Sequence, residues 1–249
     1  MKLLRLLLLL WACVPAQAQW QIFAEKLPAP GTWSTYRLER AHGAEVFSTS
    51  ELRISVRDGG MEKGKPHLWL TIEPVAWLGS KDKAPLRFLL RKDMDRTAAG
   101  RLLENSAEIL FSNPVRGPYY LLPSDVEWLS RWANLSYTSE LRPDTPATEN
   151  LKLGDKAFPC ERLRLAATTV TDPPMVAKQT IEFHGLVWRS EATPFGVVRA
   201  KWTERTTKKD LSTEETKSLT LLASGTEPPP KEPIVHGDQV TIWRLLFKR

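Results

Sequence analysis

The 249-residue chain has little cysteine and little histidine. It contains two cysteines, Cys13 and Cys160, and four histidines that lie far apart in the sequence. No His-Glu-x-x-His motif and no closely spaced cysteine pair is present, so the sequence supports neither a metal site nor a cofactor. If Cys13 is removed with a signal peptide, Cys160 has no partner for an intramolecular disulfide. A lone cysteine inside a strand is typical of a small buried hydrophobic residue, and we expect this of Cys160.

Further absences narrow the function classes. Walker A, dinucleotide-binding glycine and Gly-x-Ser-x-Gly motifs are missing, which argues against nucleotide chemistry and against hydrolases of that type. Lys and Arg exceed Asp and Glu by only 35 to 29, and basic residues alternate with acidic ones, which disfavours nucleic-acid binding. No apolar run approaches the roughly 20 residues of a membrane-spanning helix, so none is expected after signal removal.

The first residues predict export. Lys2 and Arg5 form a short basic region, and Leu3–Trp11 form an apolar region. A small-residue cleavage site follows, and we expect cleavage between Ala18 and Gln19. The mature protein is then periplasmic or extracellular.

An alternative reading of the same segment involves lipidation. Leu10–Cys13 resembles a bacterial lipobox, in which Cys13 would be acylated and become the first mature residue. Two acyl chains on Cys13 would make the protein lipid-anchored instead of soluble.

Alternation of apolar and polar residues predicts antiparallel strands from Gly31 onward. Leu52, Ile54 and Val56, for example, alternate with polar neighbours. Trp69 lies out of phase with the apolar residues beside it, so we expect it on the opposite face of its strand. The segments with strand character are 36–38, 51–57, 68–73, 86–91, 163–170, 180–188, 195–202, 219–222 and 240–247. The pattern predicts one β-rich domain over residues 19–249.

Two segments have helical character. Residues 98–111 have a helix-permissive composition with a weak apolar repeat. A helix over 124–134 is predicted by a capping box, in which Ser124 caps the helix and Glu127 reaches back. Its apolar residues cover one broad face that should lie on a sheet: Val126, Trp128, Leu129, Trp132 and Ala133.

Polar or proline-bearing stretches predict loops between these elements. We expect residues 143–149 to form a possible internal loop and residues 204–217 to form a charged hairpin end. Residues 226–233 contain four prolines and read as an extended connector.

The tryptophans admit two interpretations. The chain contains ten, one of them in the predicted signal. In the first interpretation the indoles are core or rim packing on a sheet covered on both faces. In the second they form the wall of a cleft for an apolar or amphipathic ligand, with basic residues near its mouth. The candidate ligand-binding residues are Trp69, Trp128, Trp132, Trp188, Phe195 and Arg199.

The most motif-like stretch begins at Trp188 and ends at Gly196. Pro194 and Gly196 favour a fixed turn whose backbone amides Ser190 and Glu191 can bind. This Trp-x-Ser-Glu-x-x-Pro-x-Gly stretch resembles one found in exported bacterial β-proteins of unknown function.

A more distant resemblance concerns the order of elements. An export signal, long antiparallel strands and a helix inserted midway are similar to the periplasmic lipoprotein-carrier superfamily. That resemblance implies a curved open barrel holding acyl chains against helices. It covers most of the mature chain without a shared motif, so no functional residues are transferred.

Together these observations predict a mainly antiparallel β fold with one or two helices packed on a curved sheet, as in an open or half barrel. The first function hypothesis is a non-enzymatic envelope protein that binds a lipid or acyl chain between sheet and helix. The second is a structural or partner-binding envelope module without a ligand. The third, a thiol or carboxylate hydrolase, requires an exposed Cys160 or a carboxylate pair in a concavity.

Overall fold

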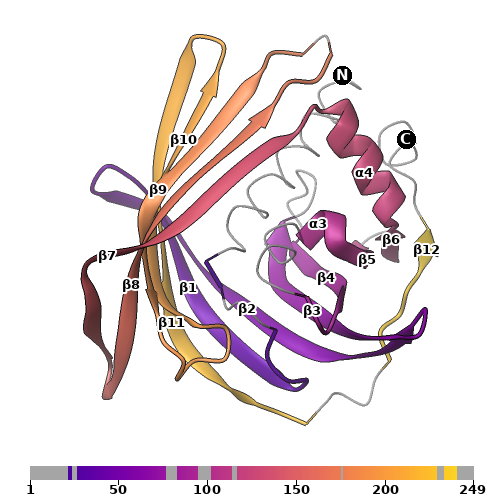
Figure 1. Cartoon of the computed structure of the whole chain (residues 1–249), viewed down its shortest axis with the longest axis horizontal. Helices are drawn as coiled ribbons and strands as arrows, with labels where there is room; N and C mark the ends of the chain where they lie inside the picture. Colours follow the sequence, from indigo (N-terminus) through magenta and orange to yellow (C-terminus); the bar gives the residue numbers. More distant parts are fainter. Residues whose placement is uncertain are drawn as a thin grey trace.

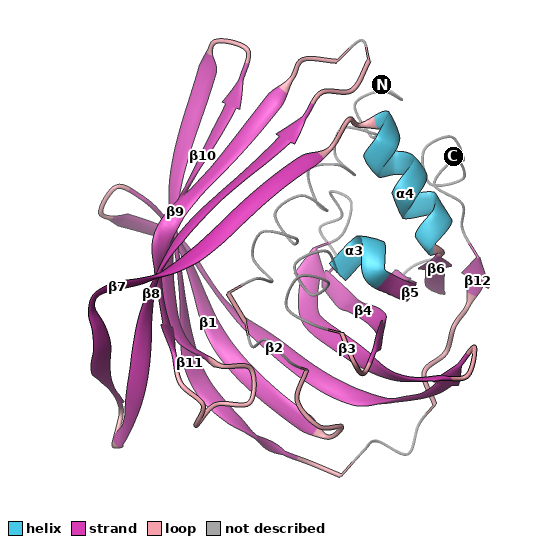
Figure 2. Ribbon diagram, in the orientation of Figure 1, coloured by secondary structure: helices cyan, strands magenta, loops and turns pink. Residues whose placement is uncertain are grey.

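The computed structural model describes residues 22–23, 27–76, 83–94, 102–113, 117–174, 176–228 and 233–239. Over these ranges the chain forms one curved sheet with short helices beside it (Figures 1 and 2). The predicted signal, its cleavage site at Ala18 and Gln19, the alternative lipidation site Cys13 and the strand predicted over 240–247 lie outside the described residues.

The sheet has 12 strands in the order β12-β6-β5-β4-β3-β2-β1-β11-β10-β9-β8-β7. Neighbouring strands are antiparallel except β12 and β6, which are parallel. The two end strands, β12 and β7, are not paired with each other, so the sheet is an open barrel, as predicted. The strands are β1 (Thr32–His42), β2 (Glu45–Glu62), β3 (Lys65–Ala76), β4 (Lys83–Arg91), β5 (Ser106–Asn113), β6 (Gly117–Leu121), β7 (Ser136–Leu153), β8 (Lys156–Thr171), β9 (Gln179–Arg189), β10 (Val197–Lys208), β11 (Leu211–Thr226) and β12 (Asp238–Gln239).

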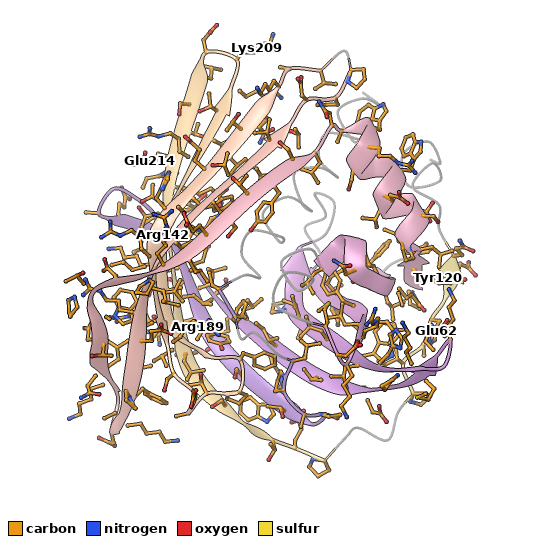
Figure 3. The ribbon with its side chains drawn as sticks, in the orientation of Figure 1. Glu62, Tyr120, Arg142, Arg189, Lys209 and Glu214 are labelled. Atoms are coloured by element: carbon orange, nitrogen blue, oxygen red, sulfur yellow. The ribbon has the colours of Figure 1, made fainter. Side chains whose placement is uncertain are left out.

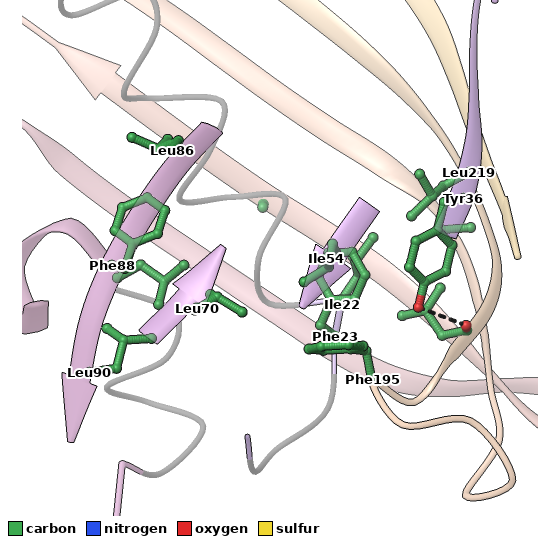
Figure 4. Close-up of a cluster of buried hydrophobic side chains, with 14 of the residues drawn as sticks. Ile22, Phe23, Tyr36, Ile54, Leu70, Leu86, Phe88, Leu90, Phe195 and Leu219 are labelled. Carbon is green, nitrogen blue, oxygen red and sulfur yellow. Dashed lines mark hydrogen bonds between the residues drawn. The ribbon is translucent and has the colours of Figure 1, made fainter. Parts of the chain in front are cut away.

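The first four strands form the predicted meander. Their inward-facing residues alternate along each strand, and cross-strand neighbours such as Ile54 and Ile72 lie on the same face. Along the central parts of these strands, such as 52–56, 68–72 and 86–90, that face is apolar because every second residue is apolar, as the period-two pattern predicted. A continuous cluster of buried side chains covers this inner face of the sheet (Figure 4).

Helix α4 (Pro123–Trp132) connects the two ends of the curved sheet. It follows β6, next to one end strand, and precedes β7, the other end strand, so it runs across the unclosed side (Figure 1). The amide of Asp172, at the end of β8, donates to the carbonyl oxygen of Ala133 at 2.8 Å. The helix therefore links the sheet ends in place of a strand-to-strand ladder.

The predicted capping box at Ser124 is wrong by two residues. The carbonyl of Leu122 accepts from the amide of Asp125 at 3.1 Å, and the Asp125 carboxylate accepts from the amide of Leu122 at 3.4 Å. Pro123 takes the first helical position, where its missing N–H costs nothing and its fixed φ suits the helix. Glu127 instead pairs with Arg131 at 3.5 Å along the helix surface.

The helix predicted over 98–111 is largely absent among the described residues. Only Leu102–Asn105 (α3) are helical, and Ser106–Asn113 form strand β5. Ile109 is buried on the inner face and Leu110 on the outer face. A strand that is apolar on both faces shows no alternation of apolar and polar residues, so the period-two pattern cannot identify it.

Two segments predicted as loops belong to strands. Residues 204–208 and 211–217 extend the β10–β11 hairpin, in which Arg205 faces Glu214 and forms an ion pair with it. Residues 143–149 lie within β7, where the register with β8 shifts between Pro143 and Thr148. The described residues of 226–233 beyond Thr226 belong to neither a helix nor a strand.

The irregular part of β7 is held by one buried carboxylate. The Asp144 side chain is 4% exposed and accepts from Arg162 Nε and from Arg164 Nη2, each at 2.7 Å. Hydrogen bonds from Arg162, Arg164 and the Thr145 backbone lower the pKa of Asp144 to about 2. An irregular, proline-bearing edge also resists pairing with other strands.

Asp144→Asn is expected to reduce the acid sensitivity of the fold. The pKa of Asp144 is lower in the folded protein than the ordinary value of 3.8, so its contribution to stability is complete above about pH 4. That contribution is lost as the pH falls from about 4 toward 2. Urea unfolding at pH 6, 4 and 2.5 should show a smaller loss in the variant than in the wild type; equal losses would contradict the assignment. Glu140→Gln, at an exposed residue of the same strand, is the control.

Candidate ligand-binding site

The candidate site is the inner face of the sheet together with α4. Tyr36, Phe88 and Phe183 are each at most 1% exposed and lie on strands far apart in the sheet order. Figure 4 shows part of this cluster, with the phenol of Tyr36 donating to the Val197 carbonyl at 3.3 Å. The inner face is thus an apolar surface that extends across most of the sheet.

Helix α4 contributes two indoles to this surface. Val126 and Ala133 are buried in the cluster, which confirms the predicted packing of the helix. Trp128 and Trp132 pack on the cluster but stay partly exposed, with ring centroids 6.4 Å apart and planes at 14°. A stacked pair of indoles that packs on the core and is also partly exposed is suited to contact an apolar ligand.

A hollow of about 570 Å³ lies along another flank of α4. This volume falls within the range of small-molecule pockets. Most of the residues that line the hollow are polar, although their exposed surface is partly apolar. The lining residues are Pro123, Glu127, Ser130, Arg131, Asn134 and Leu135.

Two ion pairs lie on the inner face beyond the apolar cluster. Lys217 Nζ and Glu204 Oε2 are 2.6 Å apart with both side chains 11% exposed, and Arg40 pairs with Glu215. Burial raises the pKa of Glu215, but the Arg40 hydrogen bond and the nearby Lys217 and Arg40 charges outweigh it and lower the pKa overall. These charges compensate one another, so this end of the inner face is polar without net charge.

Several buried polar atoms of the inner face have no hydrogen-bond partner among the described residues. The Trp202 indole N–H is one, and its residue is 4% exposed. The hydroxyls of Tyr137, Ser139 and Thr169 are others. Sequence reasoning missed this set because alternation shows which residues share a face of one strand, not which strands are neighbours.

The six predicted ligand-binding residues do not form one site. Trp128, Trp132 and Phe195 belong to the inner cluster, where Phe195 is 1% exposed and shares the buried cluster with Phe23 (Figure 4). Trp69, Trp188 and Arg199 alternate with inward-facing neighbours and lie on the outer face.

Trp69 has the outward orientation that the sequence predicted. It is 5% exposed and packs with Leu89 and Leu110 in a small outer cluster. The ring of His236 meets it edge-on at 5.8 Å, and His236 Nδ1 lies 2.9 Å from Glu108 Oε1. The segment 233–239 therefore covers Trp69 from outside.

Trp188 is held by a carboxylate on the outer face. Its indole N–H donates to Glu149 Oε2 at 2.8 Å, beside a cluster that contains Cys160. Arg199 is exposed and pairs with Trp188 across β10 and β9. Figure 3 shows the side chains on the ribbon and labels Arg189, the residue after Trp188. The turn between β9 and β10 has the predicted form, since Ser190 Oγ accepts from the Ala192 amide and Gly196 has φ 75°.

Cys160 is buried, as the sequence predicted, with 3% of its surface exposed. Its thiol donates to the Phe158 carbonyl at 3.4 Å, and burial raises its pKa. His184 faces Ala166 across the strands, six residues along β8 from Cys160. The pair therefore lacks the geometry of a nucleophile and its base.

The described residues contain no group of three or more His, Cys, Asp or Glu side chains placed to hold a metal ion. Within the same ranges, no helix has the length and apolarity needed to cross a membrane.

Comparisons with known proteins give one structural likeness. No protein-family model and no curated protein matches the chain. The crystal structure of a LolA superfamily protein from Nitrosomonas europaea is similar over 87% of this chain and 94% of that chain, with 9% identity and a TM-score of 0.27. At this TM-score, the function has to be argued from the residues of the chain itself.

Proposed function

We propose that the protein is an exported, non-enzymatic carrier that binds a lipid or acyl chain between the inner face of the sheet and α4. The observation that supports this most is the unclosed apolar sheet whose two ends are joined by an amphipathic helix. Movement of one short helix would expose an apolar surface without breaking the strand ladders. The basic and apolar segments before Ala18 support a site of action outside the cytoplasm.

The distribution of polarity supports an amphipathic ligand. The centre of the inner face is apolar, while the Glu204–Lys217 pair and the hollow beside α4, lined mostly by polar residues, lie at its margins. Each CH₂ group of an acyl chain that is buried on this surface contributes roughly 0.8 kcal/mol to the free energy of binding. Its head group would remain at a polar margin.

The alternative is an envelope module that binds a partner protein and holds no ligand. The free edge of β7 favours it, because an unpaired edge can add a strand. The prolines and the register shift in β7 oppose such pairing. The most exposed large apolar side chains, Met61 and Leu211, lie at separate hairpin turns and do not form one patch.

A fluorescence titration tests the carrier function. We expect a pyrene-labelled acyl methyl ester to bind saturably, one molecule per chain, and to quench tryptophan emission. An unlabelled ester of the same length should displace it. A signal that rises linearly without saturation, or no signal, would count against the carrier. Trp188→Phe on the outer face is the control and should leave the affinity unchanged.

A further inference from the structure

Three hydroxyl groups gather on the inner face where β7 meets β8. Tyr137 and Thr169 are direct cross-strand partners, and Ser139 is the next residue of β7 on the same face. Directly opposed side chains in an antiparallel pair lie about 5 Å apart at Cβ. These three residues therefore form a compact hydroxyl cluster beside the apolar core.

Among the described residues, the hydroxyl cluster has no hydrogen-bond partner outside its own three residues. Tyr137 Oη, Ser139 Oγ and Thr169 Oγ1 are all buried from solvent, and Thr169 as a whole is 1% exposed. Burial raises the pKa of Tyr137 to about 12, an effect that the nearby Ser139 hydroxyl partly offsets. A buried hydroxyl without a partner destabilises the fold, and several such groups close together are rare in native proteins. Their presence here therefore points to a ligand that hydrogen-bonds with them.

Among the described residues of β8 and β9, the inward positions next to the hydroxyl cluster carry no charged side chain. They hold Ala167, Thr171, Ile181 and Phe183. An anion buried here would lack a compensating cation, at a large cost in free energy. Hydroxyl donors in an apolar, uncharged setting suit a neutral acceptor such as a carbonyl oxygen.

The position of the cluster connects it to α4. Leu135 lines the hollow beside the helix and also packs on the inner cluster, two residues before Tyr137. The hydroxyls thus lie where the helix passes into the edge strand, at the margin of the apolar surface.

From this arrangement we infer that Tyr137, Ser139 and Thr169 bind the neutral ester carbonyl of an acyl-chain ligand. This inference rests on the carrier function proposed above and specifies its ligand class. The ester carbonyl accepts from the hydroxyl cluster while its chain lies along the apolar inner face.

Three pyrene-labelled probes of equal chain length test the inference: a methyl ester, a free carboxylate and an alkane. The wild type is expected to bind the ester more tightly than the other two. Thr169→Val and Tyr137→Phe should each reduce the preference for ester over alkane about three- to ten-fold, as expected for one lost hydrogen bond. Alkane affinity should stay unchanged in both variants.

Thr71→Val is the matched control. Thr71 also has a buried hydroxyl without a described partner, but it lies on the outer face beside Trp69. Its substitution should leave the ester preference intact. Thermal unfolding without ligand should show Thr169→Val to be as stable as the wild type or more stable, because an unpaired buried hydroxyl is removed.

The outcomes separate this inference from the carrier function. Binding of ester and alkane that is insensitive to Thr169→Val and Tyr137→Phe would overturn the hydroxyl assignment and leave the carrier function in place. A preference for the carboxylate would also overturn it. Failure of the wild type to bind any of the three probes would reject the carrier function and the inference together.

Discussion

Gly185→Ala is expected to destabilise the protein by about 3 kcal/mol or more, through overpacking that side-chain rotation cannot relieve. A Cβ at this position would lie 2.6 Å from both Cα and Cβ of Trp202 and even closer to the Lys201 carbonyl oxygen. These are largely backbone atoms of the facing strand β10. Since small domains are stable by only about 5–15 kcal/mol, the loss would be large in a urea or thermal unfolding measurement.

Gly225→Ala provides the matched control, because Gly225 is also a strand glycine without a positive φ. Its added Cβ would meet only the side chain of Trp33, at 3.3 Å and beyond. We expect a change within about 1 kcal/mol. Equal losses of unfolding free energy in the two variants would show that β10 does not approach Gly185 this closely.

Replacement of both Trp128 and Trp132 by Ala is expected to weaken acyl-probe binding at least ten-fold, which is about 1.4 kcal/mol. The two indoles are the large side chains that α4 presents beside the apolar surface, and both remain partly exposed. A guest between helix and sheet would bury that exposed part. Titration with the pyrene-labelled ester measures the change.

Trp188→Ala is the control for this pair, since it removes an indole of the outer face. It should reduce stability through the lost contact with Glu149 and leave the probe affinity within two-fold of the wild type. Circular dichroism confirms that each variant is folded. Unchanged affinity in the Trp128 and Trp132 double variant would place the ligand elsewhere or exclude it.

The first half of the fold could be predicted because its strands alternate strictly. Polar residues separate Leu52, Ile54 and Val56, and turn residues mark the strand ends, so local rules were sufficient. The helix after β6 was also predictable from its one-sided apolar pattern. Strand β5 was not predictable, because Ile109 and Leu110 are buried on opposite faces and no alternation remains.

Less of the candidate site than of the fold could be predicted from the sequence. The outward orientation of Trp69 follows from its phase relative to its neighbours. That Tyr137 faces Thr169 depends on the register of β7 with β8, which includes a shift at Pro143 that no local signal specifies. The sequence likewise gives the number of tryptophans but not which of them share a surface in the fold.

The most direct test of the carrier function is native mass spectrometry of protein exported from the full-length precursor in a bacterial host. The native mass is expected to exceed the denatured mass by a lipid-sized adduct, which disappears on unfolding. The denatured mass also shows whether the chain begins at Gln19 or at an acylated Cys13. Equal native and denatured masses under gentle conditions would contradict the carrier function and favour a module that binds a protein partner.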